Sequence, residues 1–484
     1  MSHQKFKINV IIVGAGTAGK LLAQDIANHD DSGFNIIGFV DDSKAKKGKD
    51  ISGFKVLGTL KDLKDLIKEH SVEELIIALP SERGRVVRDI VESTMGLRLG
   101  YKILPRSSEV LLQDYADGYL QYVREVQAED LLGGEINKSE QAEISDFAEH
   151  QTVMITGAAG SIGSELSRQI VAHGAQKVIL FDWWENGIFD LRNQIVSNYP
   201  DVDVSFIIGD VKDYNRVNAI MEKFQPTTVF HAAAYKHVPL MEENASEAVR
   251  NNIFGTKIVA EAAVRHGVQK FVLVSTDKAV NPTNIMGATK RAAEKIVHIL
   301  AASQSATTFC AVRFGNVINS NGSAIPFFEK QIAQGGPVTL THRDITRFFM
   351  TIPEAVHLIL KAWIMGENDD LFVLDMGESI KIYDLVRLLI ATHGYTPDED
   401  IGIKIIGLRP GEKLYEEVLV KSEEVQATSV DRVFRTKNYM NFDVDKFLER
   451  LSILDELVNN AYSEPLPIHD HMLQLISTFK QNQK

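Results

Sequence analysis

The chain has 484 residues, of which 44% are hydrophobic, 24% charged and 8% aromatic. This is the composition of an ordinary globular protein, and it excludes a disordered, collagen-like or disulfide-rich chain. The 52 Lys and Arg residues against 65 Asp and Glu residues give a formal net charge of −13. Because that charge repels a phosphate backbone, we expect no nucleic-acid partner.

The cysteine content and the start of the chain indicate the cytoplasm. Cys310 is the only cysteine, so no intrachain disulfide can form, as suits a reducing compartment. Residues 1–7 lead into a strand pattern without the apolar core of a signal peptide. The longest apolar stretches, such as residues 8–13, have the length of a strand, far below the roughly 20 residues that span a bilayer. We therefore expect a soluble, cytoplasmic chain without a membrane-spanning segment.

Two segments of the chain begin with the same pattern. Residues 8–27 and 152–172 each read as an apolar strand, a glycine turn and a helix, which is the start of a βαβ unit. We predict an α/β protein with two tandem Rossmann-like domains. The N-terminal domain covers 1–122, a linker covers 123–150, and a catalytic domain covers 151–484, with a substrate-binding region from about residue 316.

Short strands that alternate with helices favour a parallel sheet in each domain. In the first domain we predict strands at 35–40 and 74–79, with a helix at 60–69 between them. In the second domain we predict a doubly wound sheet of six or more strands, including 177–181, 204–208, 227–231, 270–275 and 307–313. Beyond it, short strands at 338–340, 371–374 and 403–406 belong to a region that we expect to cap the carboxyl-terminal edge of the sheet.

The second glycine turn predicts a dinucleotide site. Its glycines allow a pyrophosphate to approach the backbone at the N-terminus of the next helix. Asp182 follows at the end of the next strand, where a carboxylate binds the ribose 2′-hydroxyl and favours NAD over NADP. The alternative is a tight turn without a ligand. The predicted cofactor-binding residues are Gly157, Gly160, Ser161, Ile162, Gly163, Asp182, Asp210 and Val211 at the adenine edge, Ala232 and Ala233 beneath the cofactor, and Lys290.

The first glycine turn carries a similar motif. Gly14, Gly16 and Gly19 form GxGxxG, and Asp41 and Asp42 follow the next strand. Residues 43–122 offer no catalytic group of side chains. Two interpretations stay open: a working nucleotide site, or a degenerate regulatory or structural module.

Residues 271–290 contain the candidate catalytic groups. A predicted strand ends in Ser275, Thr276, Asp277 and Lys278, and a helix follows that holds Met286 and Lys290. In short-chain dehydrogenases a Tyr at the first position of a YxxxK pair accepts the substrate's hydroxyl proton. Because Met286 occupies that position and cannot carry a proton, a simple reductase is disfavoured. Asp277 and Lys278 form an alternative acid/base pair; the competing interpretation is a solvated turn.

These residues closely resemble a known family. It comprises the CapD-like UDP-N-acetylglucosamine 4,6-dehydratases of bacterial polysaccharide and glycan biosynthesis, in the extended short-chain dehydrogenase superfamily. The first domain looks like the module that precedes the catalytic domain in longer members, and Met286 also matches those members. They usually begin with transmembrane helices; we expect this chain to be a naturally soluble form or one from which that segment was removed. The matching segments are TGAAGSIGSEL (156–166), FHAAAYKHVPLME (230–242), NNIFGT (251–256), STDKAVNPTNIMGATKR (275–291), RFGNV (313–317), GSAIPFFEKQI (322–332), ITRFFMTIPEA (345–355) and LRPGEKLYEE (408–417).

The resemblance implies a reaction and a role for each catalytic residue. NAD oxidises C4 of the sugar, water is lost across C5–C6, and the hydride returns to C6. Lys278 is then the C5 base, and Asp277 is the acid that protonates the leaving 6-hydroxyl. Thr276 bonds the C4 oxygen, and Lys290 binds the nicotinamide ribose. A lysine base needs a lowered pKa, and we expect burial to lower that of Lys278.

Which group first deprotonates the C4 hydroxyl stays open, because Met286 is inert. We expect a water molecule relayed to Lys290 or Asp277 to take that proton. Whether C5 is retained or inverted also stays open.

The resemblance also implies the substrate-binding residues. A nucleotide diphosphate needs local cations in a protein of this charge, and guanidinium groups suit phosphate oxygens. Arg343, Arg347, Arg409 and Lys413 are candidates as a cluster, although each alone could equally be a surface ion pair. The predicted substrate-binding residues are Lys236 and His237 near the sugar, and Asn316, Ile325, Pro326, Thr339, Arg347, Arg409 and Glu412 near the nucleotide.

Two other functions remain as alternatives. A UDP-sugar epimerase or reductase shares the fold but would use Tyr at position 286 and has no role for the Asp277–Lys278 pair. A non-enzymatic NAD(H) sensor would use both glycine turns without turnover. We predict no metal site, and we expect a homo-oligomer, a dimer or larger.

Overall fold

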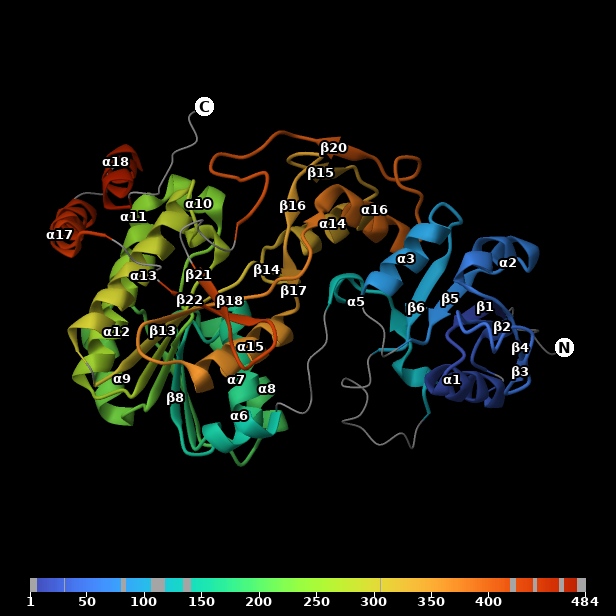
Figure 1. The fold of residues 1–484 in the computed structure, drawn as a ribbon, viewed down its shortest axis with the longest axis horizontal. Helices are drawn as coiled ribbons and strands as arrows, with labels where there is room; N and C mark the ends of the chain where they lie inside the picture. Colours follow the sequence, from blue (N-terminus) through green and yellow to red (C-terminus); the bar gives the residue numbers. More distant parts are fainter. Residues whose placement is uncertain are drawn as a thin grey trace. The chain divides into compact units, whose positions relative to one another are not determined.

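The computed structural model describes residues 7–29, 31–79, 84–105, 118–133, 141–304, 306–417, 424–437, 442–460 and 465–476. The chain divides into two compact units, which can be followed by colour in Figure 1. Unit 1 comprises Met1–Glu135, Gly322–Arg343 and Lys381–Ile406, and unit 2 comprises Ile136–Asn321, Asp344–Ile380 and Gly407–Lys484. The predicted domain boundaries at residues 122 and 150 stay predictions.

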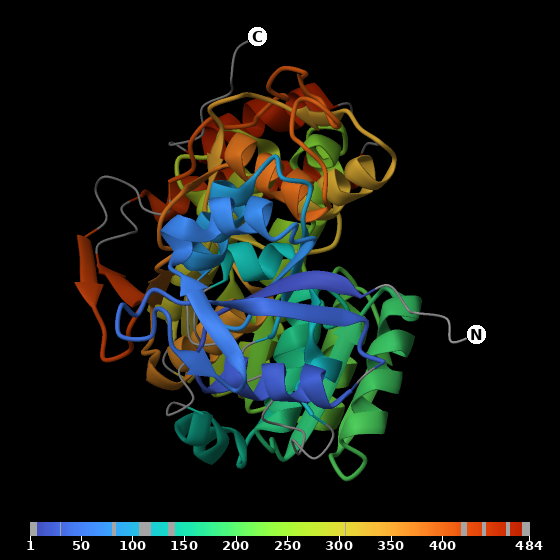
Figure 2. The same cartoon turned by 90° about the vertical axis from the view of Figure 1, so that its right-hand side faces the viewer.

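Unit 1 is built on a sheet whose described strands run in the order β3-β4-β2-β1-β5-β6-β7. Strand β1 pairs in parallel with both β2 and β5, so the strand order reverses beside β1, as in doubly wound nucleotide-binding folds. Figure 2 shows these strands and α1 in blue from a second direction. The elements are β1 (Ile8–Val13), α1 (Thr17–Asn28), β2 (Phe34–Val40), β3 (Asp50–Ile51), β4 (Phe54–Gly58), η1 (Leu60–Asp62), α2 (Leu63–Glu69), β5 (Glu74–Ile77), α3 (Gly84–Thr94), β6 (Gly100–Ile103), η3 (Leu120–Tyr122) and β7 (Arg124–Glu125).

Segments from the predicted linker and from the C-terminal half of the chain complete unit 1. Helix α5 (Ala128–Leu132) packs on α3 and buries Leu131 and Leu132. Helix α16 (Ile382–Thr392) also packs on α3, and the Arg98 guanidinium donates to Asp400 at 2.8 Å. The other elements are α14 (Ala324–Ala333), β15 (Val338–Leu340) and β20 (Ile403–Ile405), of which β15 and β20 pair in parallel.

Unit 2 contains a sheet whose described strands run in the order β10-β9-β8-β11-β12-β13-β18-β22-β21. The first six follow the order of a dinucleotide-binding fold, 3-2-1-4-5-6, and pair in parallel. The predicted fold class is therefore confirmed, and the observed strands differ from the predicted ones by about one residue at their ends. They are β8 (Thr152–Thr156), β9 (Lys177–Asp182), β10 (Val204–Ile208), β11 (Thr228–His231), β12 (Lys270–Val274) and β13 (Thr308–Arg313).

Part of the region beyond residue 316 extends this sheet, so the strand predicted at 371–374 lies within the sheet and does not cap its edge as expected. Strand β18 (Asp370–Leu374) continues it in parallel, and β22 (Val433–Lys437) and β21 (Glu424–Ala427) then add antiparallel strands. The short strands β14 (Asn316–Val317) and β17 (Phe349–Met350) form a separate parallel pair, and β16 (Thr346–Arg347) precedes β17.

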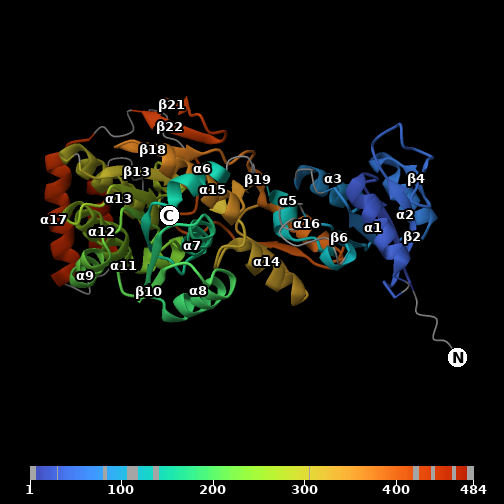
Figure 3. The same ribbon diagram turned by 90° about the horizontal axis from the view of Figure 1, so that it is seen from below.

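Helices cover both faces of the unit 2 sheet (Figure 3). One apolar cluster includes residues of α6 (Gln141–Ala148), α7 (Ser161–Ala172), α8 (Glu185–Asn198) and α15 (Ile352–Met365). The cluster on the other face includes residues of α9 (Tyr214–Phe224), α12 (Thr256–Arg265) and α13 (Ile285–Ser303). The alternating strands and helices thus bury the strands on both faces, which leaves their carboxyl-terminal ends as the edge for ligands.

A third apolar cluster of unit 2 joins α13 to the end of the chain. Helices α17 (Val444–Asn460) and α18 (Pro465–Leu475) pack there with residues of α10 (Val238–Glu243), α11 (Ala245–Ala248) and the π-helix η5 (Val249–Gly255). Met286 belongs to this cluster and is only 3% exposed. Its side chain therefore contributes to the core of unit 2.

Candidate active site

The glycine turn after β8 has the geometry that a dinucleotide needs. Gly157 has a φ of +69°, and a Cβ built on it would lie 2.6 Å from the amide nitrogen of Ala233. A Cβ on Gly163 would lie 1.9 Å from the carbonyl oxygen of Gly157. Only glycine fits at either position, so the first turn of α7 packs directly against the glycine turn. Its N-terminus is then available to a pyrophosphate.

Asp182 lies beside this turn at the end of β9. Its Oδ2 accepts from the Ala159 amide and its Oδ1 from the Trp184 amide, each at 2.9 Å. Burial raises the pKa of the carboxyl group, and the amide donors oppose that effect. Because a carboxylate can accept several hydrogen bonds, the fixed Asp182 can still receive the ribose hydroxyls of NAD. The glycine turn and the acid together fit this cofactor.

The other predicted cofactor residues lie on the same edge of the sheet. Ser161 and Ile162 form the first turn of α7, and the Ser161 hydroxyl accepts from the Asn321 amide at 3.0 Å. Val211 follows β10 and is buried, and the Asp210 carboxylate accepts from the Lys212 amide at 2.9 Å. Ala232 and Ala233 follow β11, and the Ala232 amide donates to the Thr156 carbonyl at 3.0 Å.

The candidate catalytic residues lie where β12 ends, in the short helix η6 (Asp277–Ala279) and just before it. The Thr276 hydroxyl donates to Asp277 Oδ1 at 2.8 Å, and Lys278 Nζ donates to the same oxygen at 3.1 Å. The Asp277 side chain is fully buried, whereas that of Lys278 is 23% exposed. The structure therefore joins Thr276, Asp277 and Lys278 by hydrogen bonds. The interpretation of Asp277 and Lys278 as a solvated turn is wrong, because the Asp277 side chain is fully buried.

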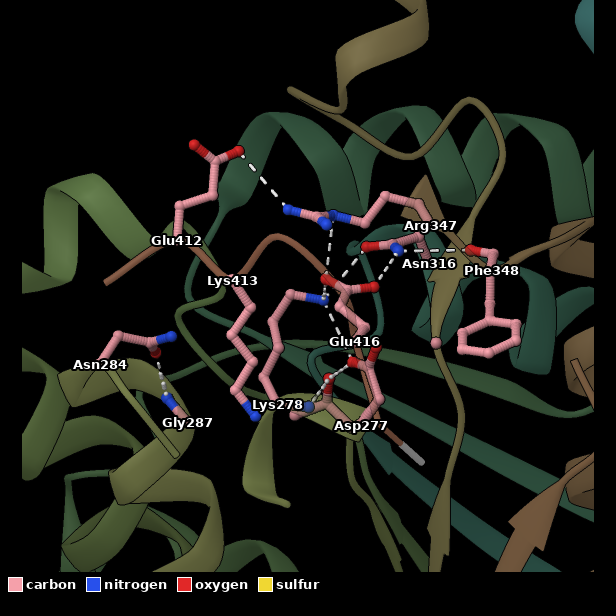
Figure 4. Close-up of polar contacts among 12 residues, drawn as sticks. Asp277, Lys278, Asn284, Gly287, Asn316, Arg347, Phe348, Glu412, Lys413 and Glu416 are labelled. Atoms are coloured by element: carbon pink, nitrogen blue, oxygen red, sulfur yellow. Dashed lines mark hydrogen bonds and ion pairs between the residues drawn. The ribbon is translucent and has the colours of Figure 1, made fainter. Parts of the chain in front are cut away.

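A carboxylate that the sequence did not single out completes this cluster. Glu416 Oε1 forms ion pairs with Lys278 Nζ and with Arg347 Nε, each at 3.1 Å. Its Oε2 accepts from Asn316 Nδ2 at 2.7 Å, and Asn316 Oδ1 accepts from Lys278 Nζ at 3.1 Å. Figure 4 shows Lys278, Asn316 and Arg347 converging on the Glu416 carboxylate. We call Asp277, Lys278, Asn316, Arg347 and Glu416 the polar cluster.

Burial and neighbouring charges set the protonation of these groups. Burial raises the pKa of Asp277 and Lys278 opposes it, while the Glu416 charge raises it further. Burial disfavours ionised Glu416, but Lys278 and Arg347 outweigh burial and lower the pKa of Glu416. Burial also disfavours the charged form of Lys278, yet the two carboxylates outweigh it, so the pKa of Lys278 is raised. The expectation that burial lowers the pKa of Lys278 is therefore wrong in this arrangement.

Helix α13 places Lys290 below the end of β12. Lys290 Nζ donates to the Val274 carbonyl at 2.8 Å, and burial lowers the pKa of the lysine to about 8. Met286, one turn earlier, lies in the apolar core rather than in the polar cluster. The helix begins at Asn284, whose side chain accepts from the Gly287 amide at 2.8 Å.

A buried ion pair supports the strand ends beneath the candidate site. Glu294, one turn beyond Lys290, accepts from Arg313 Nε and Nη2 at 2.7 Å and from the Ser275 hydroxyl at 2.6 Å. Both Glu294 and Arg313 have fully buried side chains. The hydrogen bond to Glu294 fixes the position of Ser275 and therefore that of the turn with Asp277 and Lys278 that follows it. The Glu294–Arg313 ion pair was not predicted from the sequence, in which its signal is a glutamate on the apolar face of a predicted helix.

The predicted substrate-binding residues of unit 2 are spread around the polar cluster. Arg347 Nη2 donates to Glu412 at 3.5 Å, while Arg409 is exposed and its amide donates to the same carboxylate at 3.1 Å. Desolvation and the nearby Lys278 ammonium lower the pKa of Lys236. His237 stands at the start of α10, and desolvation and Lys236 lower its pKa.

Other predicted residues belong to unit 1. Ile325 and Pro326 lie in α14 and Thr339 lies in β15, where its amide donates to Gln331 at 3.0 Å. Arg343 is also in unit 1, with its guanidinium over the ring of Tyr383. Their contact with substrate stays a prediction.

The glycine turn of unit 1 repeats the geometry of the turn after β8. A Cβ on Gly19 would lie 1.9 Å from the Gly14 carbonyl oxygen. Asp41 accepts from the Ala15 amide at 2.8 Å, as Asp182 does from Ala159. Unlike Asp182, Asp41 also pairs with a lysine, Lys46, at 2.8 Å. Both interpretations of this turn remain open.

Within the described ranges, no helix combines the length and the apolar character that a bilayer crossing requires. Two family models match the chain. A polysaccharide biosynthesis protein model covers residues 153–438, and a CoA-binding domain model covers residues 1–96.

Curated relatives agree with the first of these models. The capsular polysaccharide biosynthesis protein CapD of Staphylococcus aureus is 42% identical over 462 residues, which are 94% of this chain and 75% of the relative. A UDP-N-acetylglucosamine 4,6-dehydratase (inverting) of Campylobacter jejuni subsp. jejuni is 35% identical, over 57% of this chain and 80% of the relative. A UDP-glucose 4-epimerase of Rickettsia canadensis is also 35% identical, over 64% of this chain and 91% of the relative. The chain therefore belongs to the polysaccharide biosynthesis protein family, as a CapD-like nucleotide-sugar enzyme of the short-chain dehydrogenase superfamily.

Proposed function

We propose that this protein is a UDP-N-acetylglucosamine 4,6-dehydratase that forms a UDP-4-keto-6-deoxy sugar. The observation that carries the proposal is the Asp277–Lys278 pair at the end of β12, in which the Asp277 side chain is fully buried. A 4,6-elimination needs one base for the C5 proton and one acid for the 6-hydroxyl, and this pair supplies one group of each kind. The protein named as such a dehydratase in Campylobacter jejuni supports the choice of reaction.

Each residue of the pair has a defined task in this reaction. NAD, when bound at the glycine turn, would supply the hydride acceptor for C4 and, in its reduced form, the hydride donor for C6. Lys278, as the free amine, removes the C5 proton that the adjacent C4 ketone acidifies. Asp277, as the carboxylic acid, protonates the 6-hydroxyl so that it leaves as water. The raised pKa of Asp277 supports this role, because a buried carboxyl group keeps its proton to higher pH.

The substrate's diphosphate needs cations near this pair. Arg347 is the guanidinium that reaches the polar cluster. Lys413 lies beside Lys278 in Figure 4, and its Nζ donates to the Val280 carbonyl at 2.9 Å. We assign the diphosphate to these two groups. Thr276 is assigned to the C4 oxygen, since its hydroxyl lies within the same hydrogen-bonded cluster.

A 4-epimerase is the second candidate, favoured by the relative from Rickettsia canadensis at the same identity as the dehydratase. An epimerase oxidises and re-reduces C4 and has no task for a C5 base. The test is to incubate the protein with UDP-N-acetylglucosamine and NAD and to follow the sugar by proton NMR. The proposal expects a C6 methyl signal and loss of the 6-hydroxymethyl signals. A C4 epimer that retains its 6-hydroxyl contradicts it.

A further inference from the structure

Three oxygen atoms surround the Lys278 ammonium group, two through hydrogen bonds and one through an ion pair. An ammonium has three N–H donors, and Lys278 Nζ has three acceptors, namely Asp277 Oδ1, Asn316 Oδ1 and Glu416 Oε1, each at 3.1 Å. Two of these acceptors are carboxylates. The arrangement suits a protonated lysine and leaves no lone pair to take a proton from a substrate.

Glu416 differs from Asp277 in the element that carries it. Asp277 directly precedes Lys278 in η6, whereas Glu416 is on the segment 407–417. That segment is anchored upstream of Glu416, where the Gly411 carbonyl accepts from Thr283 at 3.0 Å and Lys413 bonds the Val280 carbonyl. Glu416 therefore reaches Lys278 from a separate segment, whereas Asp277 is held next to Lys278 by their adjacency in η6.

We propose that Glu416 is a positioning residue that holds Lys278 as an ammonium ion in the substrate-free enzyme and must leave it before Lys278 can act as a base. The inference rests on the proposed function only for the identity of the reaction that Lys278 then catalyses. When Glu416 withdraws, Lys278 releases its surplus proton to solvent and becomes a neutral amine.

The contacts of Arg347 supply a way to couple this step to substrate. Arg347 Nε forms an ion pair with Glu416, the carboxylate that also pairs with Lys278. In the substrate-free protein, the cation assigned to the diphosphate is therefore already paired with Glu416. A diphosphate that binds Arg347 competes with Glu416 for that donor and places negative charge beside it. Substrate binding thus weakens the hold of Glu416 on Lys278 and frees the base only when the substrate is present.

The groups that face Lys278 come from several elements. They are Asp277 in η6, Glu416 and Lys413 on the segment 407–417, Asn316 in β14, and Lys236 after β11. Both neighbouring lysines disfavour a charged Lys278. Arg347 in β16 adds a third positive charge, since it pairs with the same Glu416 oxygen. Removal of the Glu416 charge alone therefore leaves one carboxylate against two ammonium groups and a guanidinium, and we expect Lys278 to lose its proton at lower pH.

The test uses the full-length, substrate-free protein and measures the titration of Lys278 directly. Acetic anhydride acetylates only the neutral amine, so the rate of Lys278 acetylation, quantified by peptide mass spectrometry across a pH series, reports its protonation. We expect Glu416→Gln to raise this rate by about tenfold or more at a fixed pH near 8, a shift of about one pH unit. Glu416→Asp, which keeps the charge, should stay near the wild type.

Glu417→Gln is the matched control, because Glu417 is the adjacent carboxylate and is 48% exposed. Circular dichroism establishes that each variant is folded. Equal acetylation of Lys278 in the wild type and Glu416→Gln overturns the inference, and so does an equal increase in Glu417→Gln. Turnover of UDP-N-acetylglucosamine is measured separately. A wild type that titrates as expected but does not convert this sugar overturns the proposed function and leaves the inference standing.

Discussion

Gly287 lies so close to Lys278 that a Cβ built on the glycine would be 2.2 Å from the lysine's carbonyl oxygen. Gly287 belongs to the first turn of α13, and Asn284 fixes that turn by accepting from the Gly287 amide. The helix that carries Lys290 is thereby held directly against the turn that carries the catalytic pair. A side chain at position 287 would force the two elements apart.

We expect Gly287→Ala to lower kcat/KM by about tenfold to 10²-fold, because a displacement of the catalytic turn misplaces both members of the pair. The free energy of unfolding should fall by about 1–3 kcal/mol from overpacking, measured by denaturant titration. Gly402→Ala is the control, since a Cβ there meets nothing within 4 Å. If both variants behave alike, the close contact has no role in the site.

Asp277→Asn and Lys278→Ala should each reduce kcat by about 10² to 10⁴, the usual contribution of a general acid or base. Both proteins should remain folded, because neither change removes an apolar core side chain. Lys257→Ala, which removes a surface lysine paired only with Glu261, controls for loss of a positive charge. A loss of less than about tenfold in both catalytic variants would exclude the pair from the chemistry.

The pH dependence follows from the two protonation states that the reaction requires. Burial raises the pKa of Asp277 to about 6, and the pKa of Lys278 is raised by the neighbouring carboxylates despite its burial. The neutral fraction of Lys278 grows about tenfold per pH unit, while the protonated fraction of Asp277 shrinks about tenfold per unit above its pKa. The fraction of protein with neutral Lys278 and protonated Asp277 is the product of these two fractions. It rises up to about pH 6, the pKa of Asp277, and is then level.

We therefore expect kcat/KM, which reports the free enzyme, to increase with pH up to about 6 and to stay level from there to about pH 9. Steady-state rates in overlapping buffers provide the measurement. A continuous tenfold increase per unit up to about pH 9 would mean that Asp277 does not act as a proton donor.

Asp182→Asn should weaken NAD binding by about tenfold or more, because a hydrogen bond to a charged acceptor contributes about 1.5–3 kcal/mol. Discrimination against NADP should weaken as well. The variant's affinity is measured by NADH fluorescence titration. Asp213→Asn is the control: Asp213 caps α9 by accepting from the Arg216 amide, and Asn caps a helix equally well. Unchanged affinity in Asp182→Asn would remove this residue from the cofactor site.

The parts of the fold that depend on local pattern were predictable from the sequence. The central strands of both sheets, the glycine turn and Asp182 follow from apolar runs and from the close approach that only glycine permits, whereas the edge strands β3, β4, β6, β7, β21 and β22 were not predicted. The position of Asp277 and Lys278 at the end of β12 follows from the same pattern.

The rest depends on contacts between distant segments. Glu416 is 138 residues beyond Lys278 in the chain, and LRPGEKLYEE contains three glutamates that no local pattern distinguishes. The raised pKa of Lys278 depends on Asp277 and also on Glu416, and the second of these carboxylates could not be placed from the sequence. Likewise, the segments 322–343 and 381–406 join unit 1 through tertiary packing. The hydrophobic periodicity of a sequence does not show such packing.

Exchange of the sugar C5 proton in D₂O tests the central claim, that Lys278 is the base and Asp277 the acid of one elimination. The wild type, Lys278→Ala and Asp277→Asn are each incubated with UDP-N-acetylglucosamine and NAD, and deuterium at C5 is followed by NMR. We expect deuterium at C5 of the wild-type product, none with Lys278→Ala, and slow exchange without a C6 methyl signal with Asp277→Asn. Deuterium at C5 with Lys278→Ala at the wild-type rate would contradict the assignment of Lys278 as the base.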